Sequence, residues 1–118
     1  MDKPQKGLII KKEWLELILS GKKIVEIRSS HTKVRGKIAL IESGSGHIVG
    51  ECEIIDSTCL DTAEKLDKAM IDGCVSKDVV LVSYYKKPHA WHIKNAIRYE
   101  KPVPYKHPKG AVIWVNIN

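Results

Sequence analysis

The sequence has no phenylalanine, and aromatic residues make up only 6% of its 118 positions. Aliphatic side chains must therefore form most of the core. Apolar runs are short, such as Val79–Val82, and none approaches the roughly 18–20 residues that span a bilayer. The first residues, Met1 to Lys6, hold no apolar stretch of the kind found in signal peptides. We expect a cytoplasmic protein with no membrane segment.

Cysteine is also scarce, and Cys52, Cys59 and Cys74 form no CxxC or zinc pattern. We expect them to be small core residues or spectators rather than a metal site or a redox switch. The five histidines show no metal-ligand spacing, and the sequence lacks GxGxxG, Walker-type, HExxH and GxSxG motifs. We therefore expect no metal and no cofactor.

The composition that is present, 43% hydrophobic and 29% charged, is that of an ordinary globular domain, and the length fits one domain over residues 1–118. The net charge of +6 is spread unevenly: +5 over residues 1–50, −5 over 51–82 and +6 over 83–118. We expect the first and last parts to converge on one basic face, with the acidic middle elsewhere. Such a face attracts phosphates, although many soluble proteins carry excess lysine.

Hydrophobic periodicity predicts several strands and two short helices. The expected strands are 7–10, 24–28, 37–42, 47–56, 90–94 and 111–117, and the expected helices are 12–20 and 62–70. Val79–Val82 is too short to assign. Gly50, inside the second strand of a hairpin, indicates a bulge or bend, and the prolines of 102–108 indicate extended, edge-like chain.

These elements predict an α+β fold, a small mixed β-barrel with short helices, in which helix 12–20 covers one opening. The residues expected in its core are Ile38, Leu40, Ile54, Val112 and Trp114.

Charged residues punctuate the apolar segment Gly21–Arg28. Glu26 and Arg28 are two residues apart and so share one face of the expected strand, while Val25 and Ile27 take the other, core-facing side. The pair could be a solvated ion pair, or it could converge with Lys23 on a ligand.

Further candidate contacts lie in the basic loop after this segment, in the later strand and in a proline-framed loop near the C-terminus. With Arg28, the candidate binding residues are Ser29, Arg35, Trp91, Asn95, Lys106 and His107. Trp91 could stack on a base and Asn95 could read a base edge. An ordinary core position is an equally good interpretation of Trp91.

The segment Gly21–Arg28 fits the pattern GxKxxExR and resembles the signature of the ASCH domain family. Other matching features are spread in order along 7–117. Trp14 precedes the segment, and after it come Arg35-Gly36, Gly50-Glu51-Cys52, Ala90-Trp91-His92-Ile93 and Gly110-Ala111-Val112-Ile113-Trp114-Val115. The resemblance implies a PUA-like fold with a cleft beside the signature. RNA, nucleotides or modified nucleosides are the partners it implies, with a monomer or weak dimer as the expected state.

Some small members of this family hydrolyse N4-acylcytidine with the signature lysine, a threonine three residues later and a distant glutamate, and other members resemble ribonucleases or binding modules. Lys23 matches that lysine, whereas Glu26 stands at the threonine position. The distant glutamate could be Glu51, Glu53 or Glu64. The first hypothesis is therefore an RNA- or nucleoside-binding module with a basic cleft around Lys23, Glu26 and Arg28. The alternative is an amidohydrolase or ribonuclease with Lys23 and Glu26 as catalytic residues.

The first hypothesis places Lys23 in a partly desolvated cleft. We then expect Lys23→Ala to leave the thermal midpoint nearly unchanged and to reduce ligand affinity or turnover about ten-fold or more. Lys22→Ala should do much less.

Overall fold

The computed structural model describes residues 3–76, 78 and 87–117. Its elements follow one another as β1 (Lys6–Ile10), α1 (Lys12–Leu19), β2 (Val25–Arg28), β3 (Gly36–Glu42), β4 (His47–Cys59), α2 (Ala63–Asp72), β5 (His89–Pro104) and β6 (Trp114–Asn116). The segment Val79–Val82, which the sequence left unassigned, lies outside the described residues.

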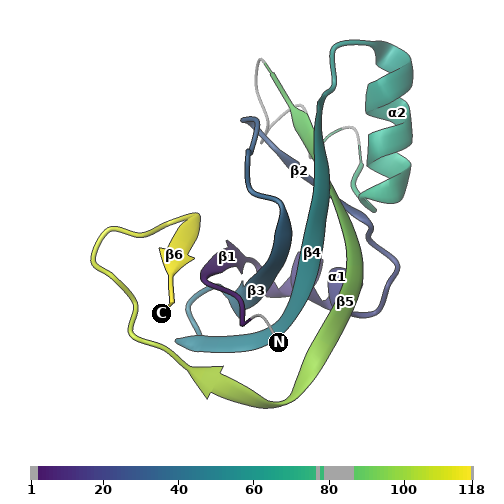
Figure 1. Ribbon diagram of the computed structural model, residues 1–118. Helices are drawn as coiled ribbons and strands as arrows, with labels where there is room; N and C mark the ends of the chain where they lie inside the picture. Colours follow the sequence, from purple (N-terminus) through teal and green to yellow (C-terminus); the bar gives the residue numbers. More distant parts are fainter. Residues whose placement is uncertain (1–2, 77, 79–86, 118) are drawn as a thin grey trace.

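The six described strands belong to one mixed sheet in the order β2-β5-β4-β3-β1-β6. Strand β1 is parallel to β3, and the other pairs are antiparallel. The long strands β4 and β5 bend strongly, so the sheet curls into a half-barrel (Figure 1). This arrangement confirms the predicted α+β class, with two short helices among the described residues.

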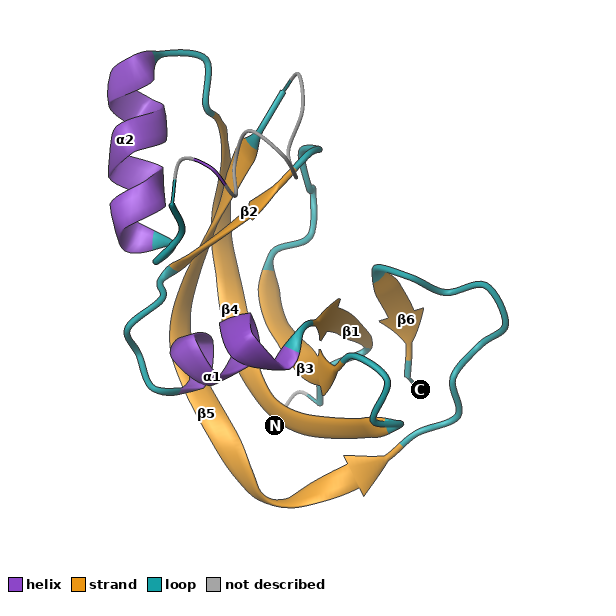
Figure 2. Ribbon diagram, turned by 180° about the vertical axis from the view of Figure 1, so that it is seen from behind, coloured by secondary structure: helices purple, strands orange, loops and turns teal. Residues whose placement is uncertain are grey.

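Helix α1 packs on the concave side of the curled sheet. Its buried residues Leu15 and Ile18 join strand residues such as Leu40 and Ile54 in one apolar cluster, which we call the concave core. Figure 2 shows α1 in front of β4.

Helix α2 covers a different part of the sheet. Its Ala69 packs with Val25 and Ile27 of β2 and with Ala90 of β5. Thr62 caps the helix by accepting a hydrogen bond from the backbone N–H of Lys65, as expected for a threonine before a helix. Strand β2 is therefore buried on both faces, one under α2 and one against the concave core.

The bend at Gly50 is confirmed. The register between β4 and β5 shifts between Ile48 and Gly50, and a Cβ on Gly50 would lie 2.4 Å from the carbonyl oxygen of Ile97. The two strands approach so closely here that only glycine fits.

Two predictions about the later strands were wrong. Strand β5 does not stop at Lys94 but continues to Pro104, paired with β4 along this length. On its other edge β2 pairs only with its first residues, and no described strand pairs with the rest of that edge, where proline is tolerated. The closing strand covers only Trp114–Asn116.

Of the five predicted core residues, Ile38, Leu40 and Ile54 are buried, Trp114 is only partly buried, and Val112 is 76% exposed. Val112 precedes the strand, in a stretch that follows the turn at Gly110 (φ 84°). No strand in the described part of the chain pairs with it.

Candidate functional site

The signature segment begins where α1 ends. Gly21 adopts a φ of +83°, the left-handed conformation that closes many helices, and the backbone N–H groups of Lys22 and Lys23 both donate to the carbonyl of Leu17. The chain then runs along the end of α2, where the N–H of Ile24 donates to the carbonyl of Asp72. This turn directs the side chain of Lys23 inward.

Lys23 is only 2% exposed. Its Nζ donates to the carbonyl oxygen of Gly73 at 2.5 Å, lies 3.5 Å from Oε1 of Glu26, and stands 5.2 Å from the ring centroid of Trp14. Burial lowers the pKa of Lys23 from its usual value, and the nearby Glu26 carboxylate opposes part of that effect. Lys23 is thus a buried, paired cation, which revises the expectation that its removal leaves stability unchanged.

Glu26 and Arg28 do not form a solvated pair. Glu26 is 4% exposed. Its Oε2 accepts a hydrogen bond from Nε of Arg28 at 2.8 Å and forms an ion pair with Nη2 of Arg28, also at 2.8 Å. The carboxylate therefore lies between two cations, Lys23 and Arg28. Only Arg28 reaches the surface, with 20% of its side chain exposed.

Arg28 also joins two distant parts of the sheet. Its Nη2 donates to the carbonyl of Ile9 at 3.0 Å, although β2 is one edge of the sheet and β1 is next to the other. Close by, the ring of Trp91 on β5 stacks on that of Trp114 on β6, with centroids 5.7 Å apart and planes 16° apart. These side-chain contacts across the curl define what we call the seam.

Trp91 is an internal part of the seam. It is 2% exposed, its Nε1 donates to the carbonyl of Ser30 at 2.8 Å, and the guanidinium carbon of Arg28 lies 5.7 Å from its ring centroid. In this structure Trp91 occupies a core position rather than offering a face to a base. The partly exposed ring at the seam is that of Trp114. Trp114 was predicted as a core residue, because nothing in the sequence shows that the sheet edges meet.

The other predicted binding residues do not gather around Arg28. Ser29 is exposed just after β2. Asn95 donates to Glu53 at 2.5 Å, and Glu53 alternates with Cys52 and Ile54 of the concave core, so it projects from the opposite face of β4.

The C-terminal candidates are equally separate. His107 hydrogen-bonds through its two ring nitrogens to Tyr105 Oη at 2.8 Å and to the carbonyl of Ala111 at 2.9 Å. With Ile9 it lines a cavity of about 510 Å³, which lies on the far side of β1 from Leu8 and Ile10 of the concave core. Lys106 is exposed in the same loop.

Arg35 lies beyond the loop that follows β2. Its guanidinium donates to the carbonyls of Thr32 and Val34 at 2.8 Å and lines a second cavity with Lys6 and Lys37. The structure therefore brings together Lys23, Glu26, Arg28 and Trp91, whereas Ser29, Arg35, Asn95, Lys106 and His107 lie in other places.

The expected separation of charge is incomplete. The acidic strand β4 lies in the middle of the sheet, where Glu51 pairs with Lys37 at 3.2 Å and Asp56 lies 3.7 Å from Arg35. Two cations of the first part are thus partly neutralised by the acidic middle part, so the proposed basic face is not uniformly positive.

Cys52 belongs to the concave core, whereas Cys59 and Cys74 are exposed, and all three are free thiols. Over residues 3–76, 78 and 87–117, the His, Cys, Asp and Glu side chains form no group of three or more that could hold a metal ion. Within the same ranges, neither helix has the length and apolar character needed to cross a membrane.

A curled mixed sheet with one helix on its concave side is the architecture of a PUA-like half-barrel. The family model of the ASCH domain matches residues 8–103, and the chain therefore belongs to the ASCH domain family.

Solved structures show the same fold. A crystal structure of ASCH from Zymomonas mobilis superposes with a TM-score of 0.78 at 14% identity, covering 99% of this chain and 90% of that chain. A tyrosine-to-phenylalanine variant of that protein gives a TM-score of 0.76 at 13% identity, covering 98% and 91%. At this identity the likeness concerns the fold alone. No curated protein matches the sequence.

Proposed function

We propose that this ASCH domain binds single-stranded RNA or a nucleoside, with Arg28 as the principal ligand contact. The family is PUA-like and associated with RNA binding. Within the signature group, Lys23 and Glu26 are buried and Arg28 alone reaches solvent. The ligand therefore meets the group through the guanidinium.

The state of Arg28 carries this proposal. Its Nε and Nη2 are held by Glu26 and by the carbonyl of Ile9, while Nη1 makes no hydrogen bond to any described residue. A planar guanidinium fixed in this way can donate to a phosphate oxygen or a base carbonyl. Because Glu26 and Ile9 already fix its orientation, little conformational entropy is lost on binding. In this reading, Lys23 and Glu26 are positioning residues for Arg28.

The hydrolase hypothesis rests on a different observation. Burial lowers the pKa of Lys23 beside a carboxylate, and a lysine with a lowered pKa can serve as a general acid or base. An N4-acylcytidine amidohydrolase or a ribonuclease would use Lys23 in this role. However, Lys23 is engaged by Gly73 and Glu26, and the Glu26 carboxylate by Arg28. The substrate would have to displace these contacts, so the geometry supports binding better than hydrolysis.

The binding test is fluorescence anisotropy with a labelled single-stranded RNA of about ten nucleotides. We expect Arg28→Gln to weaken binding about ten-fold or more, which is at least about 1.4 kcal/mol. Arg28→Lys keeps the charge but loses the planar fork, so it should also bind weakly. Lys22→Ala, which removes an exposed cation at the first unspecified position of the signature, is the control and should bind almost as well as the wild type.

Two outcomes would contradict the binding proposal. One is equal weakening by Lys22→Ala and Arg28→Gln, which would mean that any cation serves. The other is an enzymatic reaction, detected by chromatography: release of cytidine from N4-acetylcytidine, or cleavage of the RNA. This reaction would have to be abolished in Lys23→Met while that variant remained folded. That result would establish the hydrolase.

A further inference from the structure

We infer that a single-stranded RNA bound at Arg28 continues over the ring of Trp114 to a basic pocket at the start of β1 and β3. There, Lys3, Lys6, Arg35 and Lys37 would meet its phosphodiester backbone. This inference rests on the proposed RNA-binding function and extends it to a path with two phosphate subsites on either side of an aromatic ring.

Register connects the two ends of the path. Arg28 lies over Trp91, and Trp91 stacks on Trp114. Trp114 is opposite Leu8 in the β1–β6 pair, and Lys6 is opposite Asn116. Because side chains alternate along a strand, Lys6 shares a face with Leu8, which belongs to the concave core. Lys6 therefore lies about 7 Å along β1 from the Trp114 position, on the same side of the sheet.

The pocket has a cavity volume of about 480 Å³ and no acidic residue in its lining. Two of its cations have acidic neighbours outside the lining, Lys37 with Glu51 and Arg35 with Asp56. Its apolar floor includes Ile38 of the concave core and Val34, which packs against that core. The pocket thus adjoins the cluster that contains Trp91 and is flanked by Trp114. Lys3 and Lys6 have no ion-pair partner among the described residues, so their charges are available to an anion.

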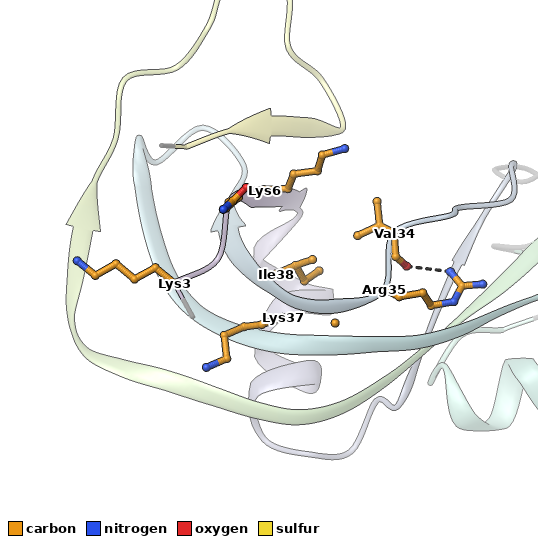
Figure 3. Close-up of a pocket in the computed structure, with 8 residues that line it drawn as sticks. Lys3, Lys6, Val34, Arg35, Lys37 and Ile38 are labelled. Carbon is orange, nitrogen blue, oxygen red and sulfur yellow. Dashed lines mark hydrogen bonds between the residues drawn. The ribbon is translucent and has the colours of Figure 1, made fainter. Parts of the chain in front are cut away.

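The directions of the cations indicate the shape of the ligand. In Figure 3 the ends of Lys3, Lys6 and Lys37 point away from one another, and the guanidinium of Arg35 turns toward the carbonyl of Val34. A single small anion could not meet all four groups. A chain of phosphates could, since each cation would meet a different charge along it.

Cations on both sides of a partly exposed aromatic ring form the usual arrangement for single-stranded nucleic acid. One face of the Trp114 ring is used by Trp91. The partly exposed remainder offers a surface on which a base can stack, while the flanking cations neutralise the phosphates. An acidic peptide would satisfy the cations but would have no aromatic group to stack.

The experiment compares two double variants of equal charge. Lys3→Gln with Lys6→Gln removes the two unpaired cations of the pocket. Lys65→Gln with Lys68→Gln removes two exposed cations of α2, at the other end of the sheet (Figure 1). Each is titrated against a labelled ten-nucleotide RNA at several salt concentrations, and against cytidine 5′-monophosphate as a probe that is too short to span the path.

For the pocket variant we expect RNA affinity to fall about ten-fold or more at low salt, and the slope of log affinity against log salt to decrease by about 1.4, or 0.7 per lost phosphate contact. Affinity for the mononucleotide should not change. Binding of RNA should also quench tryptophan fluorescence in the wild type, and Trp114→Phe, which keeps an aromatic ring in the seam, should remove most of that quenching.

Equal behaviour of the two double variants would overturn the inference while leaving RNA binding at Arg28 intact. Unchanged quenching in Trp114→Phe would overturn the stacking role. If neither the wild type nor any variant bound RNA, the proposed function itself would fail, and tight binding of an acidic peptide by the wild type in that case would identify a protein ligand instead.

Discussion

Replacing Lys23 by alanine should destabilise the protein strongly. Nζ of Lys23 is the donor to the Gly73 carbonyl and one of two cations beside the buried Glu26 carboxylate. In Lys23→Ala the carboxylate keeps only Arg28, the carbonyl loses its donor, and the side-chain volume is left empty. Removing one partner of a buried ion pair typically costs about 3–5 kcal/mol.

That cost can be expressed as a shift in thermal midpoint. An unfolding entropy of about 2.1 cal/mol/K per residue makes 1 kcal/mol worth about 4 °C in a chain of 118 residues. We therefore expect the midpoint of Lys23→Ala to fall by about 12–20 °C, as measured by circular dichroism or calorimetry.

The matched control is Lys22→Ala. Lys22 is adjacent but exposed, and surface substitutions usually stay within about 0.5 kcal/mol, or about 2 °C here. A second variant, Lys23→Met with Glu26→Gln, removes both charges and should recover part of the loss, because the Glu26 position then carries no buried charge that lacks its lysine partner. If Lys23→Ala melted within about 2 °C of the wild type, the reasoning from the buried pair would be refuted.

Three further predictions concern other parts of the structure. Arg28→Lys should melt below the wild type in calorimetry, because an ammonium cannot hold both Glu26 and the Ile9 carbonyl; an unchanged midpoint would argue against the seam contact. Gly50→Ala should lower the free energy of unfolding, measured by denaturant titration, by about 2 kcal/mol or more through overpacking; full stability would mean that β4 and β5 separate easily. Burial raises the pKa of Cys52 to about 12 from 9.0, so the unfolded chain loses this proton first and stability falls between pH 9 and 12. Unfolding at pH 8 and 10.5 should show a loss about 2 kcal/mol smaller in Cys52→Ala, and equal losses would contradict it.

The sequence identified the signature residues but not their surroundings. Spacing correctly placed Glu26 and Arg28 on one face of a strand, and the family resemblance singled out Lys23. Which of these three side chains is buried depends on α1, on the end of α2 at Gly73 and on the curl of the sheet. These contacts join residues up to 50 positions apart, and no local pattern encodes them.

The same limit explains the misplaced strands and binding residues. The prolines in β5 are compatible with a strand because that part of β5 has a free edge, and a free edge is a property of the sheet rather than of the segment. Asn95 and His107 lie on other faces because bulges and loop paths set their direction. Valine is common in strands, but none of the described strands covers Val112.

The seam closes the half-barrel with side chains alone. Within the described residues, strands β2 and β6 are the two edges of the sheet, and Arg28 with the Trp91–Trp114 stack spans the curl between them. Such side-chain contacts break one at a time, whereas the hydrogen bonds of a backbone ladder break cooperatively. Thermal opening of the fold therefore concentrates at the seam, and we expect the amide hydrogens of β6 to exchange earlier than those of β4. A ligand that touched Arg28 and Trp114 together would fasten both edges, and part of its binding free energy would be spent on suppressing that motion.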